Sequence, residues 1–296
     1  MIRKTIYIGN PTSLSLKEEQ LILKQDTGIE KSIPVEDIGL LVLDHAQTRI
    51  SVPLLSKLSQ WNVAVMVCNE KHMPQGMMLN IEGHTLQSAR FKAQVGASLP
   101  LQKNLWQQTV KAKIQNQAAV CEIAGVPNAR LLDLAEKVRS GDPDNLEAQA
   151  AQYYFRRIFS EDESFRRKPE GDFPNPLLNY GYAVVRAIVA RAITGTGLHP
   201  TLGISHQNQY NPFCLADDIM EPYRPYVDLT VWEYMNNRGP GIELTKEDKA
   251  ELLKIPVRDT IIDGKASPLM NAAQRTAASL VACYQGEARK LLYPEL

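Results

Sequence analysis

The hydrophobic pattern of this 296-residue chain changes its period once, close to residue 85. Before that point, short runs rich in Val, Ile and Leu lie between turn residues, which is typical of strands: RKTIYIG, SLSLKEEQLILKQ, IGLLVLD and VAVMVCN. Beyond it, apolar residues recur at every third or fourth position, which is typical of helices. The pattern predicts an α+β, multidomain chain, with a small N-terminal β-sheet or sandwich domain over residues 1–85 and a larger all-helical domain over residues 86–296.

Turn and capping residues mark the individual elements. In the strand-rich part, VPLLSKLSQ (52–60) predicts one short helix, and pairing between neighbouring strands is favoured over a long parallel sheet. In the second part, residues 86–97 predict a linker helix, Gly125 a helix end and Asn128 a helix N-cap. Further helices are predicted for LEAQAAQYYFRRIF, LLNYGYAVVRAIVARAIT, TVWEYMNN, KEDKAELLKI and MNAAQRTAASLVACYQGEARKLL.

The composition argues against several classes of protein. Lys+Arg and Asp+Glu each number 33, so any attraction to DNA must be local, or supplied by metal ions and oligomerisation. The four cysteines lie far apart without a CxxC pair, which argues against a disulfide framework or a zinc finger. No run of about 18 apolar residues is present, and MIRKTIYIGN lacks the apolar core of a signal peptide. A cytoplasmic protein with no membrane partner is therefore expected.

Glu147 is the first candidate for chemistry. In NLEAQAAQYYF it shares a helix face with Ala150, Ala151 and Tyr154, which would face the interior of a helical bundle. A carboxylate there must be paired or bind a cation, because an unpaired buried charge is costly. The alternative is a helix cap, because Asp144-x-x-Glu147 has the spacing of a capping box and an acid in a first turn complements the helix dipole. The residues alone leave both interpretations open.

A second group of polar residues follows the long apolar helix. Glycines and a proline between residues 195 and 203 build a constrained turn that brings His206 to a fixed place, although a lone loop histidine is more often a surface residue. Asp217, Asp218 and Glu221 come next, with the three- or four-residue spacing that places two carboxylates on one helix face. The alternative is acidic bias at the start of a short helix that Pro222 ends.

Together these residues suggest metal-dependent chemistry. One imidazole and several carboxylates, without cysteine, suit a divalent ion such as Mg²⁺ or Mn²⁺. Such an ion can hold a phosphodiester and activate a water or a sugar hydroxyl. The chain contains no GxxxxGK[ST], no GxGxxG after a strand and no GxSxG. The motifs that usually indicate P-loop nucleotide hydrolysis, a Rossmann cofactor site and serine hydrolysis are therefore absent.

Along nearly its whole length the sequence resembles a known family. The stretches that carry the resemblance are, in order, IGLLVLDHAQTRISVPLLSKLSQWNVAVMVCNEKHMPQGMML, EAQAAQYYF, NPLLNYGYAVVRAIVARAI, GLHPTLGISH and LADDIMEPYRP. Each stretch is a weak signal, but the ordered set is specific. It resembles the CRISPR-associated adaptation integrase/endonuclease family, numbered one in its series. The length and the DHAQTRIS and NEKHMPQGM stretches look most like the branch from type II systems.

The resemblance implies an active site in the helical domain. The family's metal-binding glutamate falls on Glu147, its histidine on His206, and its second acid on Glu221, where many members have Asp. These three residues would hold Mg²⁺ or Mn²⁺. Asp218 falls on the acid three residues before Glu221 and is expected to assist them, with Asp217 as the weaker candidate. The resemblance therefore favours catalytic roles for Glu147 and His206 over the cap and loop alternatives.

The implied function is the insertion of short duplex DNA, called a spacer, into a CRISPR array. A 3′-hydroxyl would attack a phosphodiester by transesterification, and water in its place would make the protein an endonuclease. The implied partners are spacer-precursor and repeat or leader DNA, a second copy of the chain in a homodimer, and a small ferredoxin-like adaptation protein numbered two. For the type II branch, the effector nuclease and an accessory protein are added. Two alternatives stay open, a catalytically silent DNA-binding or assembly subunit and a general nuclease on branched DNA.

Overall fold

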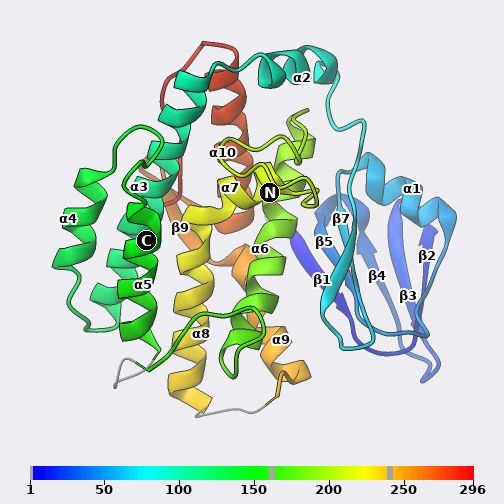
Figure 1. Cartoon of the computed structure of the whole chain (residues 1–296). Coiled ribbons are helices and arrows are strands. Elements are labelled where there is room, and N and C mark those ends of the chain that lie inside the picture. The colour runs from blue at the N-terminus through cyan, green and yellow to red at the C-terminus, as the bar shows by residue number, and fades with distance from the viewer. Residues whose placement is uncertain (1–2, 160–163, 239–242) are drawn as a thin grey trace.

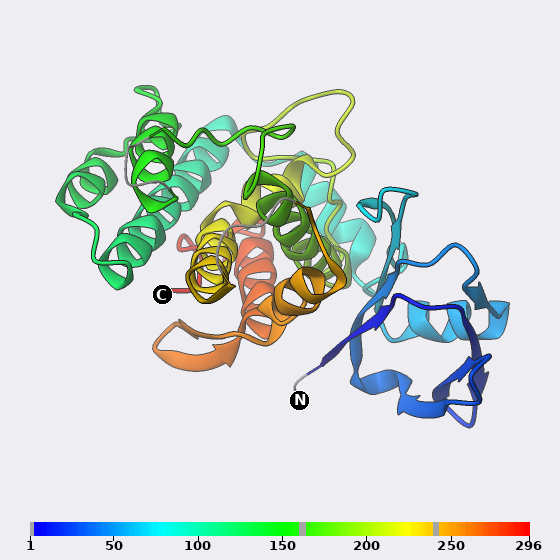
Figure 2. The same ribbon diagram turned by 90° about the horizontal axis from the view of Figure 1, so that it is seen from below.

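The computed structural model describes residues 3–159, 164–238 and 243–296. A strand-rich first part lies beside a helical body (Figure 1). Seen from below, the first part occupies one side of the molecule, and its N-terminal strand starts next to the helical body (Figure 2). The predicted fold class is confirmed, with most strands up to Met78 and most helices from Gln87 onward. The division into domains at residues 85 and 86 stays a prediction.

Two four-stranded sheets form the first part, and one of them is mainly parallel. Its order is β1 (Lys4–Ile8), β5 (Ile38–Leu43), β7 (Ala64–Cys68) and β8 (Pro74–Met78). The strands β1, β5 and β7 are parallel, and β8 returns antiparallel to β7. The preference for pairing between neighbouring strands was therefore wrong for this sheet. The short helix α1 (Val52–Gln60) comes between β5 and β7 in the chain and supplies the crossover that a parallel pair needs.

The second sheet follows the predicted pairing of neighbours more closely. It has the order β4 (Glu30–Pro34), β3 (Gln20–Gln25), β2 (Thr12–Lys17) and β6 (Arg49–Ile50). The strands β2 and β3 form a hairpin whose turn residues, Glu18 and Glu19, both have positive φ angles of 47° and 64°. Two successive residues with positive φ match the right-handed twist of a tight hairpin.

The strands β5 and β7 contribute to two hydrophobic cores at once. Side chains of a strand alternate between its two faces, and here Leu40, Val42, Ala64 and Met66 belong to the large core of the helical body. Their neighbours in sequence, Leu41, Val63 and Val65, belong to a smaller core between the sheets and α1. The mainly parallel sheet therefore joins the two parts of the molecule through apolar packing.

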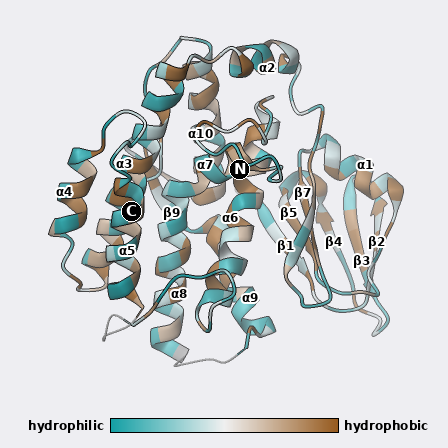
Figure 3. Cartoon of the chain, viewed as in Figure 1, coloured by the Kyte–Doolittle hydropathy of each residue, from teal (hydrophilic) through white to brown (hydrophobic). Residues whose placement is uncertain are grey.

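The helical body is built around one buried helix, α6 (Asn175–Gly195), which packs against α7, α8, α9 and α10 and reaches β5, β7 and β8. Hydrophobic and hydrophilic residues alternate along the helices of the body (Figure 3). No helix in the described residues is both long and apolar enough to cross a membrane. The other helices are α2 (Gln87–Val95), α3 (Leu99–Ile123), α4 (Ala129–Lys137), α5 (Leu146–Ile158), α7 (Cys214–Met220), α8 (Arg224–Arg238), α9 (Lys246–Leu252) and α10 (Leu269–Tyr284).

The helical part also holds a two-stranded hairpin, β9 (Asp259–Ile262) and β10 (Lys265–Pro268), which the prediction of an all-helical second half did not include. Its turn is Asp263-Gly264, and both residues have positive φ angles, 52° and 67°. Asp-Gly is a strong hairpin signal when alternating apolar residues flank it. Strands of four residues are too short for the hydrophobic period to separate them from a loop.

Two of the predicted helix ends can be compared directly with the structure. Gly125 follows α3 with φ of 71°, and the backbone N–H of Val126 donates to the carbonyl of Cys121 at 2.8 Å, which closes the helix as predicted. Asn128 precedes α4 but its side chain makes no cap hydrogen bond. Asn128 therefore stands at the predicted N-cap position, but its amide donates to the carbonyl of Ala118 at 3.3 Å and ties α4 to α3 instead of capping the helix.

Candidate active site

Glu147 lies in the first turn of α5, and a different residue caps that helix. The carboxylate of Asp142 accepts hydrogen bonds from the backbone N–H of Leu146 at 2.9 Å and of Glu147 at 3.0 Å. Asp144, the expected capping partner, instead pairs with Arg139 at 2.7 Å. The Glu147 side chain is therefore left for another role, and its Oε1 lies 2.6 Å from the ammonium of Lys113 on α3.

Glu221 reaches the same lysine from the other side. It follows α7 directly and begins the short 3₁₀ helix η2 (Glu221–Tyr223), which packs against α3. Its Oε2 lies 2.5 Å from Lys113 Nζ, and its Oε1 accepts from Arg224 Nε at 2.8 Å. The Lys113 ammonium is thus the partner of Oε2, and the Arg224 guanidinium is the partner of Oε1. Two carboxylates from separate elements thus meet at one cation.

Burial and charge oppose each other in this cluster. Lys113 is 7% exposed and Glu221 is 5% exposed. Burial alone would lower the pKa of Lys113, but Glu221 and Glu147 outweigh it, so the pKa is raised and the ammonium stays charged. Burial alone would raise the pKa of Glu221, but Arg224 and Lys113 together lower it to about 2. The cluster therefore holds Lys113, Arg224 and Glu221 in their charged forms near neutral pH.

His206 is held by Asp218. The carboxylate of Asp218 on α7 accepts hydrogen bonds from the backbone N–H of Ile204 at 2.6 Å and of Ser205 at 2.8 Å, and it also contacts the His206 ring at Nδ1. This contact raises the pKa of His206 although burial opposes it, and Glu221 and Glu147 add to the rise. With Nδ1 bound to Asp218, the other ring nitrogen, Nε2, is the one available to a ligand.

The turn before His206 requires a glycine. A Cβ added at Gly203 would lie 2.3 Å from the carbonyl oxygen of His206 and 2.9 Å from Oδ2 of Asp218. On the other side of the ring, Trp106 of α3 packs edge-on, with the ring centroids 5.7 Å apart. The glycine-rich turn, Asp218 and Trp106 together fix where the imidazole lies.

Asp217 lies next to Asp218 but serves a different contact. Its carboxylate pairs with Arg186 of α6 at 2.6 Å and accepts from the side-chain amide of Asn211 at 2.7 Å. It therefore anchors the loop before α7 to α6. Of the two adjacent aspartates, only Asp218 contacts the imidazole.

A metal ion fits this site by donor chemistry, though not without rearrangement. Two carboxylates and one imidazole suit Mg²⁺ or Mn²⁺, and the carboxylates of Glu147 and Glu221 already meet at one cation, the Lys113 ammonium. As they stand, however, no three His, Cys, Asp or Glu side chains of the described residues converge closely enough to hold an ion. The Lys113 ammonium lies between the two carboxylates instead.

Lys113 was not predicted, although the sequence contains a signal for it. The buried side of α3 includes Trp106 and Val110, and Lys113 continues their spacing of three to four residues. A lysine on an apolar stripe must find an anionic partner, because burying an unpaired charge is costly. The stripe could therefore have indicated a buried ion pair, but not which carboxylates it joins.

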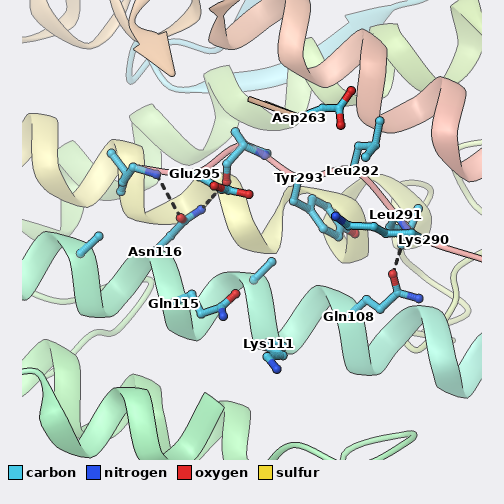
Figure 4. A pocket seen from close by; sticks show the side chains of 14 residues that line it. Gln108, Lys111, Gln115, Asn116, Asp263, Lys290, Leu291, Leu292, Tyr293 and Glu295 are labelled. Carbon is cyan, nitrogen blue, oxygen red and sulfur yellow. Dashed lines mark hydrogen bonds between the residues drawn. The ribbon is translucent and has the colours of Figure 1, made fainter. Parts of the chain in front are cut away.

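A separate pocket of about 460 Å³ lies along another face of α3 (Figure 4). Gln108 and Asn116 border it and bind the segment after α10: Gln108 accepts from the backbone N–H of Leu291 at 2.8 Å, and Asn116 donates to the carbonyl of Pro294 at 2.9 Å. Lys111 also lines this pocket, and residues two positions apart lie on nearly opposite sides of a helix. The pocket includes none of the predicted site residues.

Comparison with known sequences gives matches over the whole chain. The family described as "CRISPR associated protein Cas1" matches residues 6–263. The CRISPR-associated endonuclease Cas1 of Neisseria meningitidis serogroup C is 38% identical over 299 residues, which cover 100% of this chain and 97% of that protein. A protein of Francisella tularensis subsp. novicida, CRISPR-associated endonuclease Cas1 1, is 24% identical over 95% of this chain and 94% of its own length.

Solved structures share the fold at lower identity. A casposase bound to integration product has a TM-score of 0.79 at 19% identity, covering 98% of this chain and 92% of its own. A Cas1 protein from Thermotoga maritima has a TM-score of 0.75 at 20% identity, covering 96% and 98%. A Cas6-RT-Cas1–Cas2 complex has a TM-score of 0.75 at 20% identity, covering all of this chain and 37% of the longer one.

Proposed function

This chain belongs to the Cas1 family of CRISPR-associated proteins, and from that premise we propose that it is the integrase and endonuclease of CRISPR adaptation. The 3′-hydroxyl of a short duplex DNA would attack a phosphodiester at the boundary of a CRISPR repeat, once on each strand. The new bond to phosphorus would replace the bond to the 3′-oxygen of the cut strand, which would leave as a 3′-hydroxyl. With water as the attacking group, the same site would cut DNA. The 38% identity with the Neisseria meningitidis protein supports the type II branch.

One observation carries the proposed chemistry. Glu147 and Glu221, from separate elements, reach the same cation, and His206 lies within electrostatic reach of both carboxylates. Two carboxylates together with Nε2 of His206 are the donor set that we propose for Mg²⁺ or Mn²⁺. Such an ion, when bound, would polarise the phosphate and make the attacking hydroxyl or water more acidic.

The other contacts assign roles to the protein's own groups. Asp218 fixes the imidazole through Nδ1, so that Nε2 faces away from it. Arg224 holds Oε1 of Glu221 at 2.8 Å and leaves Oε2 for the ion. Trp106 packs edge-on against the imidazole and helps to fix where it lies. These residues position the ligands and take no part in bond making themselves.

The proposed partners follow from paired chemistry. Insertion of a spacer needs two reactions a fixed distance apart, so we propose a homodimer that acts on duplex DNA together with the small ferredoxin-like protein numbered two. A solved complex that pairs a Cas1 chain with Cas2 supports the small protein as a partner, and a casposase bound to integration product supports DNA as one. The type II effector nuclease and an accessory protein are further proposed partners, and the cytoplasm is the proposed location.

An integration assay tests the proposal. The protein, with its small partner, is mixed with a 3′-hydroxyl duplex and a supercoiled plasmid that carries a repeat, in Mn²⁺ or in EDTA. We expect joined products only with Mn²⁺, and a loss of at least about 100-fold in Glu147→Gln and His206→Ala. Lys111→Met is the matched control, because Lys111 is exposed on another face of α3 and should leave activity unchanged.

The same assay separates the alternatives. Undiminished joining in His206→Ala would contradict the proposed metal site. DNA binding by the unaltered protein without any joining or cutting would indicate a silent assembly subunit. Equal turnover on plasmids with and without a repeat, together with cutting of branched DNA, would indicate a general nuclease.

A further inference from the structure

Lys113 takes an unusual place for a lysine. It lies in the middle of α3, 7% exposed, with its ammonium 2.6 Å from Glu147 and 2.5 Å from Glu221. Neither carboxylate is a neighbour of Lys113 in sequence, and each comes from a different element, α5 and η2. The lysine therefore forms the only direct link between these two acids that the described contacts provide.

Without this ammonium the two acids would be difficult to bring together. The Glu221 side chain is 7% exposed and the Glu147 side chain is 24% exposed, so water screens their repulsion weakly. Arg224 balances Glu221 from the far side at Oε1 and does not reach between them. Lys113 supplies the positive charge where the carboxylates face each other, which is also where an ion shared by both would have to lie.

From this geometry we infer that Lys113 is a positioning residue that stands in for the divalent cation in the metal-free protein and gives up its place when the cation binds. The inference rests on the proposed function, because it assumes that Glu147 and Glu221 are metal ligands. Cation binding is then an exchange of one positive charge for another. The lysine side chain has four flexible methylene groups, so its ammonium can move. Glu147 is the more exposed of the two carboxylates, and the ammonium would move toward solvent on that side.

The exchange predicts that one substitution has opposite effects on two quantities, the stability of the metal-free protein and its affinity for the metal ion. In the metal-free protein, removal of the ammonium leaves two weakly solvated carboxylates facing each other, which lowers stability. In the presence of metal, the ion no longer has to displace a charged hydrogen-bond donor, so its affinity rises. Lys113→Met has a similar length without the charge and should show both effects, whereas Lys111→Met, on the other face of the same helix, should show neither.

Two measurements on the purified full chain test this. In EDTA, Lys113→Met should unfold at a temperature at least about 5 °C below that of the unaltered protein. Titration with Mn²⁺, followed by calorimetry or by the electron paramagnetic resonance of free Mn²⁺, should give a dissociation constant about tenfold smaller for Lys113→Met. An unchanged or larger dissociation constant would overturn the inference.

A third measurement does not depend on the folding of Lys113→Met. In ¹⁵N spectra of lysine ammonium groups, the buried Lys113 signal, assigned by its absence in Lys113→Arg, should be visible in EDTA and should shift or disappear at saturating Mg²⁺. A signal that stays unchanged would overturn the inference. His206→Ala distinguishes a failure of the proposed metal site from a failure of the inference about Lys113. If the unaltered protein binds Mn²⁺ no better than His206→Ala, the proposed metal site is wrong, and the inference with it.

Discussion

At the residue scale, a single carboxylate determines both the shape of a loop and the direction of a ring. Asp218 accepts from the backbone of Ile204 and Ser205 and contacts Nδ1 of His206. It is fully buried on α7. The Asp218 carboxylate cannot move without breaking its hydrogen bonds to two backbone N–H groups and opening the turn. The imidazole that it contacts is therefore held in place by helix α7. This is how an isolated histidine in a glycine-rich segment comes to have one defined orientation.

We expect Asp218→Asn to weaken Mn²⁺ binding by roughly 10- to 100-fold, because the imidazole loses the carboxylate that fixes its tautomer. The measurement is a Mn²⁺ titration, with ¹⁵N spectra of the histidine ring to follow the tautomer. Asp217→Asn is the matched control: its side chain pairs with Arg186 and Asn211, so Mn²⁺ affinity should stay within about twofold. Equal affinities for both variants would contradict the role of Asp218.

A second residue predicts a pH effect on stability. Asp228 on α8 is 1% exposed and accepts a hydrogen bond from the Tyr182 hydroxyl, and burial raises its pKa to about 7. The folded state therefore holds this proton more tightly than the unfolded state does. The stability that the proton provides is complete below the unfolded pKa and is lost as the pH rises through about 7.

Asp228→Asn should remove this effect, because the amide stays neutral while its oxygen still accepts from Tyr182. Relative to the unaltered protein, the variant should gain up to about 4 kcal/mol of unfolding free energy between pH 4 and pH 8. Urea unfolding at several pH values measures it. Asp133→Asn, on the exposed side of α4, is the matched control for replacing one aspartate by asparagine. A pH-independent difference for Asp228→Asn would contradict this origin.

At the element scale, α6 determines how the helices that carry the site can approach one another. It is buried over most of its length and lies between α7, α8 and α10. Gly181 marks the closest crossing, because a Cβ added there would lie 2.4 Å from Cγ1 of Val227 on α8. Close packing of this kind transmits strain, since a core has little free volume to absorb an added methyl group.

Gly181→Ala should therefore destabilise the protein by about 1–3 kcal/mol, although alanine is the better helix former. Guanidinium unfolding gives the difference. Gly76→Ala is the control, because the nearest atom to its added Cβ is 4.0 Å away and no strain is expected. A Gly181→Ala variant as stable as Gly76→Ala would mean that α8 can shift away without cost.

The elements themselves were largely predictable, whereas their long-range contacts were not. The helix over 52–60 and the long apolar helix from Asn175 to Gly195 follow from period and end signals, which are local. The hairpin around Asp263-Gly264 is too short for its period to show. The parallel pairing of β1 with β5 depends on a crossover that the two strands do not encode. For the site, sequence reasoning named the carboxylates and the imidazole but missed Lys113, whose partners lie 34 and 108 positions away.

At the scale of the whole molecule, a buried cluster of polar groups joins the strand-rich part to the helical body. Asp44, at the end of β5, accepts from Lys249 of α9 at 2.7 Å and from the Tyr7 hydroxyl at 2.6 Å, and it contacts Nδ1 of His72 at 2.8 Å. Both Asp44 and Lys249 are 3% exposed. Burial favours the neutral form of Asp44, but these three partners together lower its pKa.

Lys249→Met should lower the free energy of unfolding by about 3–5 kcal/mol, because it leaves Asp44 buried without its charged partner. The double variant Asp44→Asn/Lys249→Met should recover part of this loss. Lys254→Met is the control, since Lys254 pairs with Glu251 at an exposed position and should change stability by less than about 1 kcal/mol. A loss in Lys249→Met no larger than in the control would show that this ion pair does not hold the two parts together.

The alternation along β5 and β7 has a consequence for how the chain reaches its native state. Since successive residues from Leu40 to Val42 and from Ala64 to Met66 belong to opposite cores, sliding either strand by one position would turn these side chains to the wrong core, and both cores would lose packing together. A register error in either strand thus destabilises both cores. Packing of each core therefore favours the same strand register that the other core requires.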